Sequence, residues 1–136
     1  MHYRSVAVAV GGAAEIEAIL NVALGLFASA TRIYVVTVVP QDWFDGVDAS
    51  SDVYASFVRR VRNVAKRSAA RLGVEPDRVH VLQGAPAPRV HDFCAQAGTD
   101  LLVVGLGNNA EGGGRLGSVA WTLLQDAPCD VLTLRV

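Results

Sequence analysis

The sequence predicts an α/β fold: a single-domain, doubly wound parallel sheet of five strands with four helices around it, over residues 1–136. Two observations carry this prediction. Short segments rich in β-branched residues are apolar at every position, which is typical of strands covered on both faces. Between them lie segments with apolar residues at helical spacing, long enough to cross from one parallel strand to the next.

The first half of the chain holds two of these buried strands. Residues 4–10 predict the first strand, and residues 32–39 (RIYVVTVV) predict the second, which Pro40 stops. A helix is expected between them over residues 14–30, with an inner face of Ile16, Ile19, Leu20, Ala23, Leu24 and Phe27.

A long helix is expected next. Residues 40–51 have turn chemistry without a period and predict a mobile loop, whereas residues 52–73 predict the helix. Its apolar stripe is expected to comprise Val53, Phe57, Val61, Val64, Ala65, Ser68 and Leu72. The opposite face is basic, with Arg59, Arg62, Lys66, Arg67 and Arg71. Such a face is either solvated or a docking surface for an acidic partner.

The second half continues the alternation of strands and helices. Strands are expected near residues 78–84, 100–105 and 130–135, and helices over residues 88–97 and 117–126. The first of these strands alternates apolar and polar residues and suits a sheet edge. The expected inner faces are Val90, Phe93, Cys94 and Ala97 in one helix and Ala120, Leu123, Leu124 and Ala127 in the other.

Composition narrows the classes of partner. The chain is 51% hydrophobic with a net charge of -1, so electrostatics give no reason to expect binding to nucleic acid or to an anionic membrane. No apolar run approaches the roughly 18 residues that a membrane span needs. The first residues lack the features of a secretory signal, and a cytoplasmic location is therefore expected.

Neither the cysteines nor the histidines are spaced as metal ligands, so no metal site is expected. Cys94 and Cys129 stand 35 positions apart without a CxxC motif. They are interpreted as two small buried residues in a reducing compartment, with a redox pair as the alternative. His2, His80 and His91 are scattered, and each is expected at the surface or at a strand edge.

A glycine-rich stretch, GLGNNAEGGGRLGS, runs from Gly105 to Ser118. Glycine lets backbone N–H groups turn toward a ligand. Gly117 and Ser118 stand where a helix is expected to begin, which favours an anion, and Arg115 adds a cation nearby. The stretch contains neither the P-loop motif GxxxxGKS/T nor GxGxxG, because residue 110 is alanine.

The chain resembles the universal stress protein family in three segments. These are VVGLGN at residues 103–108, GAPAPRV at residues 84–90 and GSVAWTLLQDAPCDVLTLR at residues 117–135. The resemblance implies a Rossmann-like sheet with strand order 3-2-1-4-5. It also implies a site for ATP, with Mg²⁺, or for another adenine nucleotide, formed by Val10, Gly11, Val39, Gly105, Gly107, Asn108, Arg115, Gly117, Ser118 and Val119.

The chain departs in two places from the family's nucleotide binders, which carry the pattern G-2x-G-9x-G-S/T. If the pattern starts at Gly105, its second glycine falls on Asn108 and the last spacing is one residue short. If Gly107 takes the second place, the first falls on Val104. Binders also carry Asp after the first strand, where this chain has Gly11. A buried polar group without its partner costs about 1–3 kcal/mol, so weak binding through a degenerate loop is expected.

Three functions remain open at this stage. The first is a homodimeric stress-response protein that senses adenine nucleotide, for which no catalytic residue is expected. The second is a slow ATPase, and the third is a ligand-free interaction module of the same fold. The sequence opposes an enzyme, because it lacks a P-loop lysine, an HxGH histidine pair and a catalytic triad.

The last strand, residues 130–136, is expected to form a homodimer. From residue 132 on its apolar and polar residues alternate, which suits an exposed strand at the sheet edge. The family resemblance implies an isologous dimer through this strand, with a monomer as the alternative. Trp121, out of phase with the inner face of its helix, is expected to be an additional interface anchor.

Overall fold

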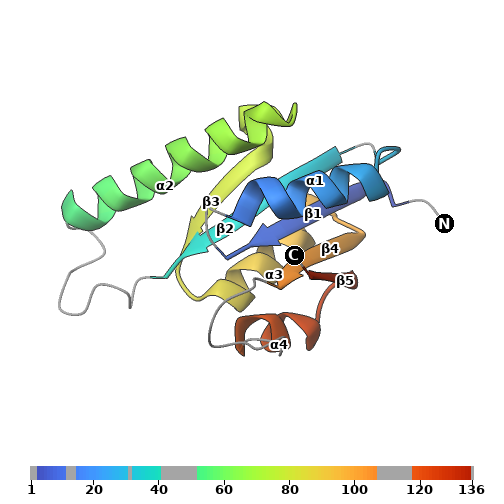
Figure 1. Ribbon diagram of the computed structural model, residues 1–136. Helices are drawn as coiled ribbons and strands as arrows, with labels where there is room; N and C mark the ends of the chain where they lie inside the picture. Colours follow the sequence, from blue (N-terminus) through green and yellow to red (C-terminus); the bar gives the residue numbers. More distant parts are fainter. Residues whose placement is uncertain (1–2, 12–14, 31, 41–51, 107–117, 136) are drawn as a thin grey trace.

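A computed structural model describes residues 3–11, 15–30, 32–40, 52–106 and 118–135 of the chain. Its centre is a sheet of five parallel strands in the order β3-β2-β1-β4-β5 (Figure 1). The strands are β1 (Ser5–Val10), β2 (Arg32–Val39), β3 (Val79–Gln83), β4 (Leu101–Leu106) and β5 (Asp130–Arg135). All four pairings between neighbours are parallel. The predicted architecture and strand order are confirmed.

Four α-helices connect the strands, as predicted. They are α1 (Ile16–Leu26), α2 (Asp52–Arg71), α3 (Pro86–Ala97) and α4 (Ser118–Leu124), and a short 3₁₀ turn, η3 (Pro76–Arg78), precedes β3. The predicted loop at residues 41–51 lies outside the described residues. Of the helices that the structure describes, none is both long and apolar enough to span a bilayer.

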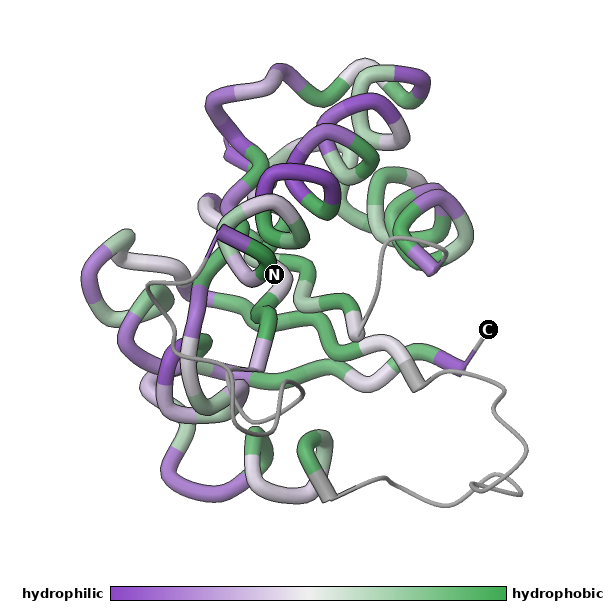
Figure 2. The backbone as a smooth tube through the Cα atoms, turned by 90° about the vertical axis from the view of Figure 1, so that its left-hand side faces the viewer, coloured by the Kyte–Doolittle hydropathy of each residue, from purple (hydrophilic) through white to green (hydrophobic). Residues whose placement is uncertain are grey.

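The helices cover the two faces of the sheet in pairs, with α1 and α2 on one face and α3 and α4 on the other (Figure 1). Alternate residues of β1 serve the two cores, because successive side chains of a strand point to opposite faces. Val6, Val8 and Val10 pack against α1, whereas Ala7 and Ala9 lie under α3 and α4. In Figure 2 the central strands are mostly hydrophobic, whereas the outer helices alternate in hydropathy.

The inner face of α2 differs from the predicted stripe. Val53 and Val64 are 63% and 39% exposed, and Tyr54, which the apolar pattern did not include, is buried. The hydroxyl of Tyr54 donates to the carbonyl of Val39 across 2.9 Å, so this side chain satisfies its polar atom inside the core. Val58, Ala65 and Ala69 complete the buried face. Arg71, on the basic side, pairs with Glu17 of α1 across 2.8 Å.

Two smaller predictions also need correction. Leu124, expected on the inner face of α4, is 36% exposed because it is the last residue of that helix. His91, expected at the surface, is half-buried on α3, and its Nε2 lies 2.9 Å from the carbonyl oxygen of Leu123. This hydrogen bond joins α3 to the end of α4, where the last carbonyls of a helix need partners. His80 lies on the edge strand β3, as predicted.

Candidate functional site

The sheet has one switch point in its strand order, between β1 and β4. The chain leads from β1 toward β2 on one side and from β4 toward β5 on the other. Ligands of doubly wound sheets bind outside the carboxyl ends of the strands at this position. Gly11 follows β1, Val39 ends β2 and Gly105 lies near the end of β4. The structure therefore brings these predicted site residues together at the carboxyl ends of the central strands.

Gly105 is explained by packing against α1. A Cβ atom at this position would overlap the side chain of Ile19. Ile19 is fully buried in the core between α1 and the sheet. The absence of a side chain at residue 105 therefore lets α1 lie directly on β4, close to the switch point.

The two valines at the strand ends have buried side chains. Val10 and Val39 are 6% and 2% exposed. The carbonyl of Val39 accepts hydrogen bonds from the hydroxyl of Tyr54 and from the backbone N–H of Gly84, at 2.9 and 3.3 Å. Because both of its lone pairs are used, this carbonyl offers no spare acceptor to the edge of a base.

Glu15 is a residue that the sequence pattern does not single out. It stands at the N-cap position of α1, and its side chain does not cap the helix. Its Oε2 atom would lie 3.6 Å from a Cβ atom placed on Gly11. The carboxylate therefore lies beside the position where nucleotide binders of the resembled family carry Asp. An acidic residue at a helix start is common, so its place in the sequence gives no signal of a site.

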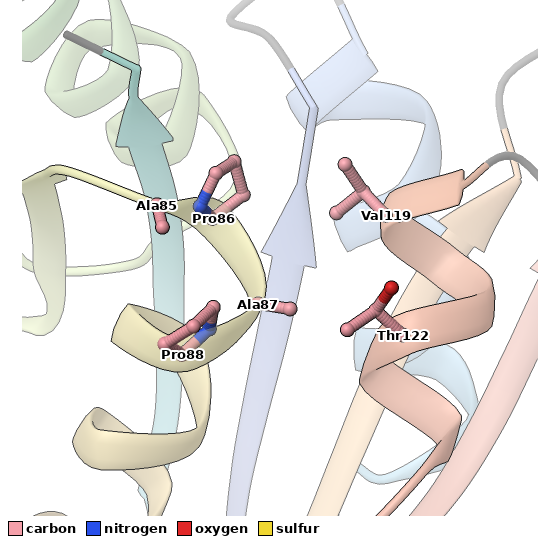
Figure 3. A pocket seen from close by; sticks show the side chains of 6 residues that line it. All are labelled: Ala85, Pro86, Ala87, Pro88, Val119 and Thr122. Atoms are coloured by element: carbon pink, nitrogen blue, oxygen red, sulfur yellow. The ribbon is translucent and has the colours of Figure 1, made fainter.

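A hollow of about 220 Å³ opens between the first turns of α3 and α4 (Figure 3). Its lining residues are Ala85, Pro86, Ala87, Pro88, Val119 and Thr122. Figure 3 shows Val119 and Thr122 of α4 facing Pro86 and Ala87 of α3, with the end of β1 behind them. The α3 side of this hollow was not predicted as a site, although the GAPAPRV segment that forms it resembles the family. Ligand pockets usually have roughly 300–1,000 Å³, so this open hollow is smaller than a complete ligand pocket.

The remaining predicted residues belong to the glycine-rich stretch. Gly107, Asn108, Arg115 and Gly117 lie outside the described residues. The helix predicted after them is present, and α4 begins at Ser118. Val119 is 45% exposed on its first turn. Within the described ranges, no three histidine, cysteine or acidic side chains are grouped so that they could hold a metal ion.

These features define a doubly wound α/β protein with an apolar hollow and a carboxylate at the switch-point edge of its sheet. The chain belongs to the universal stress protein family, which it matches over residues 2–135. A search of curated proteins gave no match.

Solved structures of the same family share the fold. The universal stress protein UspA of Lactobacillus plantarum matches with a TM-score of 0.74 and 20% identity, and the match covers 99% of each chain. A universal stress protein in complex with cAMP gives a TM-score of 0.57 at 22% identity, over 99% of this chain and 98% of that one. The protein of Archaeoglobus fulgidus in complex with dAMP gives 0.61 at 18% identity, over 98% of both chains. At these identities the likeness shows a common fold.

Proposed function

We propose that this chain binds an adenine nucleotide at the switch point of its sheet and acts as a homodimeric stress-response protein without efficient catalysis. Two proteins with the same fold were solved with adenine nucleotides, cAMP in one and dAMP in the other. In this chain, ATP with its Mg²⁺ would be a weak ligand, because the glycine pattern is incomplete.

The observation that carries the proposal is the Glu15 carboxylate beside Gly11. An ionised carboxylate accepts hydrogen bonds from the hydroxyls of a ribose. Among the residues that the structure describes, Glu15 has no hydrogen-bond or ion-pair partner. It would supply from α1 the group that the sequence lacks at position 11.

The hollow between α3 and α4 supports the same proposal. Its walls are short apolar side chains and proline rings, with the Thr122 side chain as the polar exception. A planar base suits such a surface, since most ligand sites are apolar with a few polar groups that fix orientation. Ser118, at the start of α4, is the residue of this region proposed to lie nearest the phosphates.

The homodimer is proposed through β5. This strand lies at one edge of the sheet, with β4 as its neighbour, and Thr133 and Arg135 are exposed. An edge strand presents unpaired backbone groups that must be covered, blunted or paired. Trp121 of α4 is 58% exposed in the helix just before β5, and aromatic residues are enriched at interfaces.

The proposal is tested on freshly purified protein. The protein is denatured and its supernatant is examined by mass spectrometry; nucleotide-free protein is then titrated with ATP, AMP and cAMP by calorimetry. Adenine nucleotide in the supernatant, or saturable binding of one of the three, supports the proposal. Absence of both would contradict it and favour the ligand-free interaction module, and steady release of phosphate from ATP would favour the slow ATPase.

A further inference from the structure

Two thiols that are distant in the sequence meet in the core under α3 and α4. Cys94 of α3 is 1% exposed, and Cys129, the residue before β5, is half-buried against the same hydrophobic cluster. Both side chains belong to this one cluster, and Thr99 contacts both residues. Neither is part of the proposed nucleotide site, because Cys94 lies in the last turn of α3 whereas the hollow lies at its first.

Thr99 links the two cysteines. Its backbone N–H donates to the carbonyl of Cys94 across 3.1 Å, and its Oγ1 lies 3.9 Å from the Sγ of Cys129. Thr99 is itself 7% exposed. The sulfur of Cys129 therefore lies beside a hydroxyl at the rim of the hydrophobic cluster, with the carboxylates of Asp130 and Asp100 close enough to act on it.

The surroundings of the two thiols are unequal. Burial raises the pKa of Cys94 to about 11. Burial also raises the pKa of Cys129, and the negative charges of Asp130 and Asp100 act in the same direction, whereas the neighbouring Thr99 hydroxyl and Cys94 thiol oppose it. Hydrogen bonds to the charged form favour ionisation. Cys129 is thus the more accessible of the two cysteines, and the Thr99 hydroxyl lies beside its sulfur.

We propose that Cys129 and Cys94 are a hydroperoxide-sensitive thiol pair, in which Cys129 attacks the oxidant and Cys94 resolves the product to a disulfide. In the first step the Cys129 thiolate attacks one peroxide oxygen. The S–O bond forms, the O–O bond breaks, and the leaving alkoxide or hydroxide takes a proton. Cys129 is then a sulfenic acid.

In the second step the sulfur of Cys94 attacks the sulfur of Cys129. The S–S bond forms and the S–O bond breaks, and the departing hydroxide combines with the Cys94 proton to give water. In total the two thiols lose two electrons and two protons. The hydroperoxide is reduced to one alcohol and one water, or to two waters when hydrogen peroxide is the oxidant.

Burial sets the speed of this reaction. The thiolate is the nucleophile, so below the pKa of Cys129 the rate rises about tenfold for each unit of pH. At neutral pH the pair reacts slowly, and it responds to sustained rather than brief exposure to peroxide. The disulfide would join the last turn of α3 to the residue before β5.

The test treats the whole chain with hydrogen peroxide at several pH values. We expect the intact mass to fall by two hydrogen atoms per chain, peptide mapping to join Cys94 to Cys129, and dithiothreitol to reverse the change. A disulfide between two chains, seen as a covalent dimer on a non-reducing gel, would overturn the proposal. So would an unchanged mass after prolonged exposure above neutral pH.

Single variants test the order of the two steps. Cys94→Ser should trap the sulfenic acid, so that dimedone labels Cys129, whereas Cys129→Ser should leave Cys94 unlabelled. Labelling of Cys94 at the same rate in Cys129→Ser would overturn the assignment. Thr99→Val keeps both thiols and removes the hydroxyl, and it should slow the labelling of Cys129 in the Cys94→Ser background by roughly threefold to tenfold. If the serine variants do not fold by circular dichroism, the alanine variants answer the same question, and the wild-type mass measurement needs no variant.

Discussion

Glu15 shows how a single side chain changes the interpretation of this site. Gly11 alone indicates a lost carboxylate, because the family's nucleotide binders carry Asp there. The structure places the Glu15 carboxylate beside that position from a different element, the start of α1. A sequence motif gives the order of residue types along the chain, and it does not show which side chains are neighbours in space. In the proposed nucleotide site, Glu15 can therefore supply the carboxylate that position 11 lacks.

Replacing Glu15 tests this role directly. Glu15→Gln should weaken binding of adenine nucleotide by roughly tenfold, because hydrogen bonds to a charged acceptor are lost or weakened. Glu17→Gln is the matched control on the same helix, since Glu17 is engaged by Arg71 and should change affinity less than about twofold. Calorimetric titration of both variants measures the difference. Equal affinities in the two variants would remove Glu15 from the site.

A second substitution links Glu15 to position 11. Among the described residues, the Glu15 carboxylate is the nearest group to a Cβ atom placed on Gly11, and the contact is an ordinary 3.6 Å, so these residues leave space for a side chain. In the wild type, Gly11→Asp would place two like charges together, so little gain is expected. In the Glu15→Gln background the same change should restore most of the lost affinity. The titrations above would show whether the two positions substitute for each other.

Asp100 makes the stability of the fold depend on pH. Its two oxygens accept the backbone N–H groups of Arg4 and Ser5, each at 2.9 Å, at the start of β1. Partial burial alone would raise the pKa of Asp100, but these hydrogen bonds and the Arg4 charge lower it. A lowered pKa in the folded state gives stability that is present above the ordinary aspartate pKa and is lost as the pH falls through the folded value.

Urea unfolding of two variants, Asp100→Asn and Asp92→Asn, measures this contribution to the free energy of unfolding. Asp100→Asn should cost about 1 kcal/mol at neutral pH, because one of the two N–H groups loses its acceptor. The difference from the wild type should shrink as the pH falls through the pKa of Asp100. Asp92→Asn, an exposed acid of α3, should have no measurable effect at either pH. A constant difference at all pH values would contradict the role given to the charge.

At the scale of elements, the contact between α1 and β4 depends on a missing side chain. Ile19 occupies the space that a Cβ atom of Gly105 would take. Because helix and strand approach at this point, the carboxyl end of β4 and the beginning of α1 are held in fixed relation at the switch point. Gly105 thus fixes the position of α1 relative to β4 because it leaves space for the Ile19 side chain.

Gly105→Ala should destabilise the fold by about 1–3 kcal/mol, because the added methyl overpacks the core. Gly25→Ala is the control: Gly25 lies in α1, no described residue comes near its Cβ position, and this change should stabilise the helix by about 0.5–1 kcal/mol. Unfolding in urea gives both values. Combining Gly105→Ala with Ile19→Val should recover part of the loss, and no recovery would argue against this contact as the cause.

The sequence predicted helices and strands correctly where the pattern of apolar residues fitted only one kind of secondary structure. The runs VAVAV and DLLVV are apolar throughout or nearly so, and each became a buried central strand. The stripe of α2 was displaced because Val53 and Val64 are apolar but exposed, and because the polar atom of Tyr54 finds a partner inside the core. Of the candidate site, the sequence predicted the residues at the carboxyl ends of the strands and on the first turn of α4. The contacts of Glu15 and the α3 wall of the hollow join residues that no spacing rule connects.

At the scale of the whole molecule, β5 is an edge strand through which we propose a homodimer. Thr133 is exposed on this edge strand, which is the surface of the proposed isologous pair. Thr133→Lys would add a positive charge to this edge in both chains of the proposed dimer and should shift it toward the monomer. Asn63→Lys, on the exposed side of α2, adds the same charge away from the edge. Light scattering at micromolar concentration distinguishes the two, and a wild-type mass of 14.3 kDa that does not rise on concentration would rule out the dimer.

The central place of β1 also has a consequence for protein synthesis. Val6 of β1 pairs with Leu101 of β4, which follows it by most of the length of the chain. A ribosome adds about 5–20 residues per second, so one edge of β1 waits on the order of ten seconds for its neighbour to be made. During that interval a strand of valine and alanine is open to pairing with other nascent chains. Translation rate and chaperone supply should therefore control how much of this protein reaches its native state in the cell.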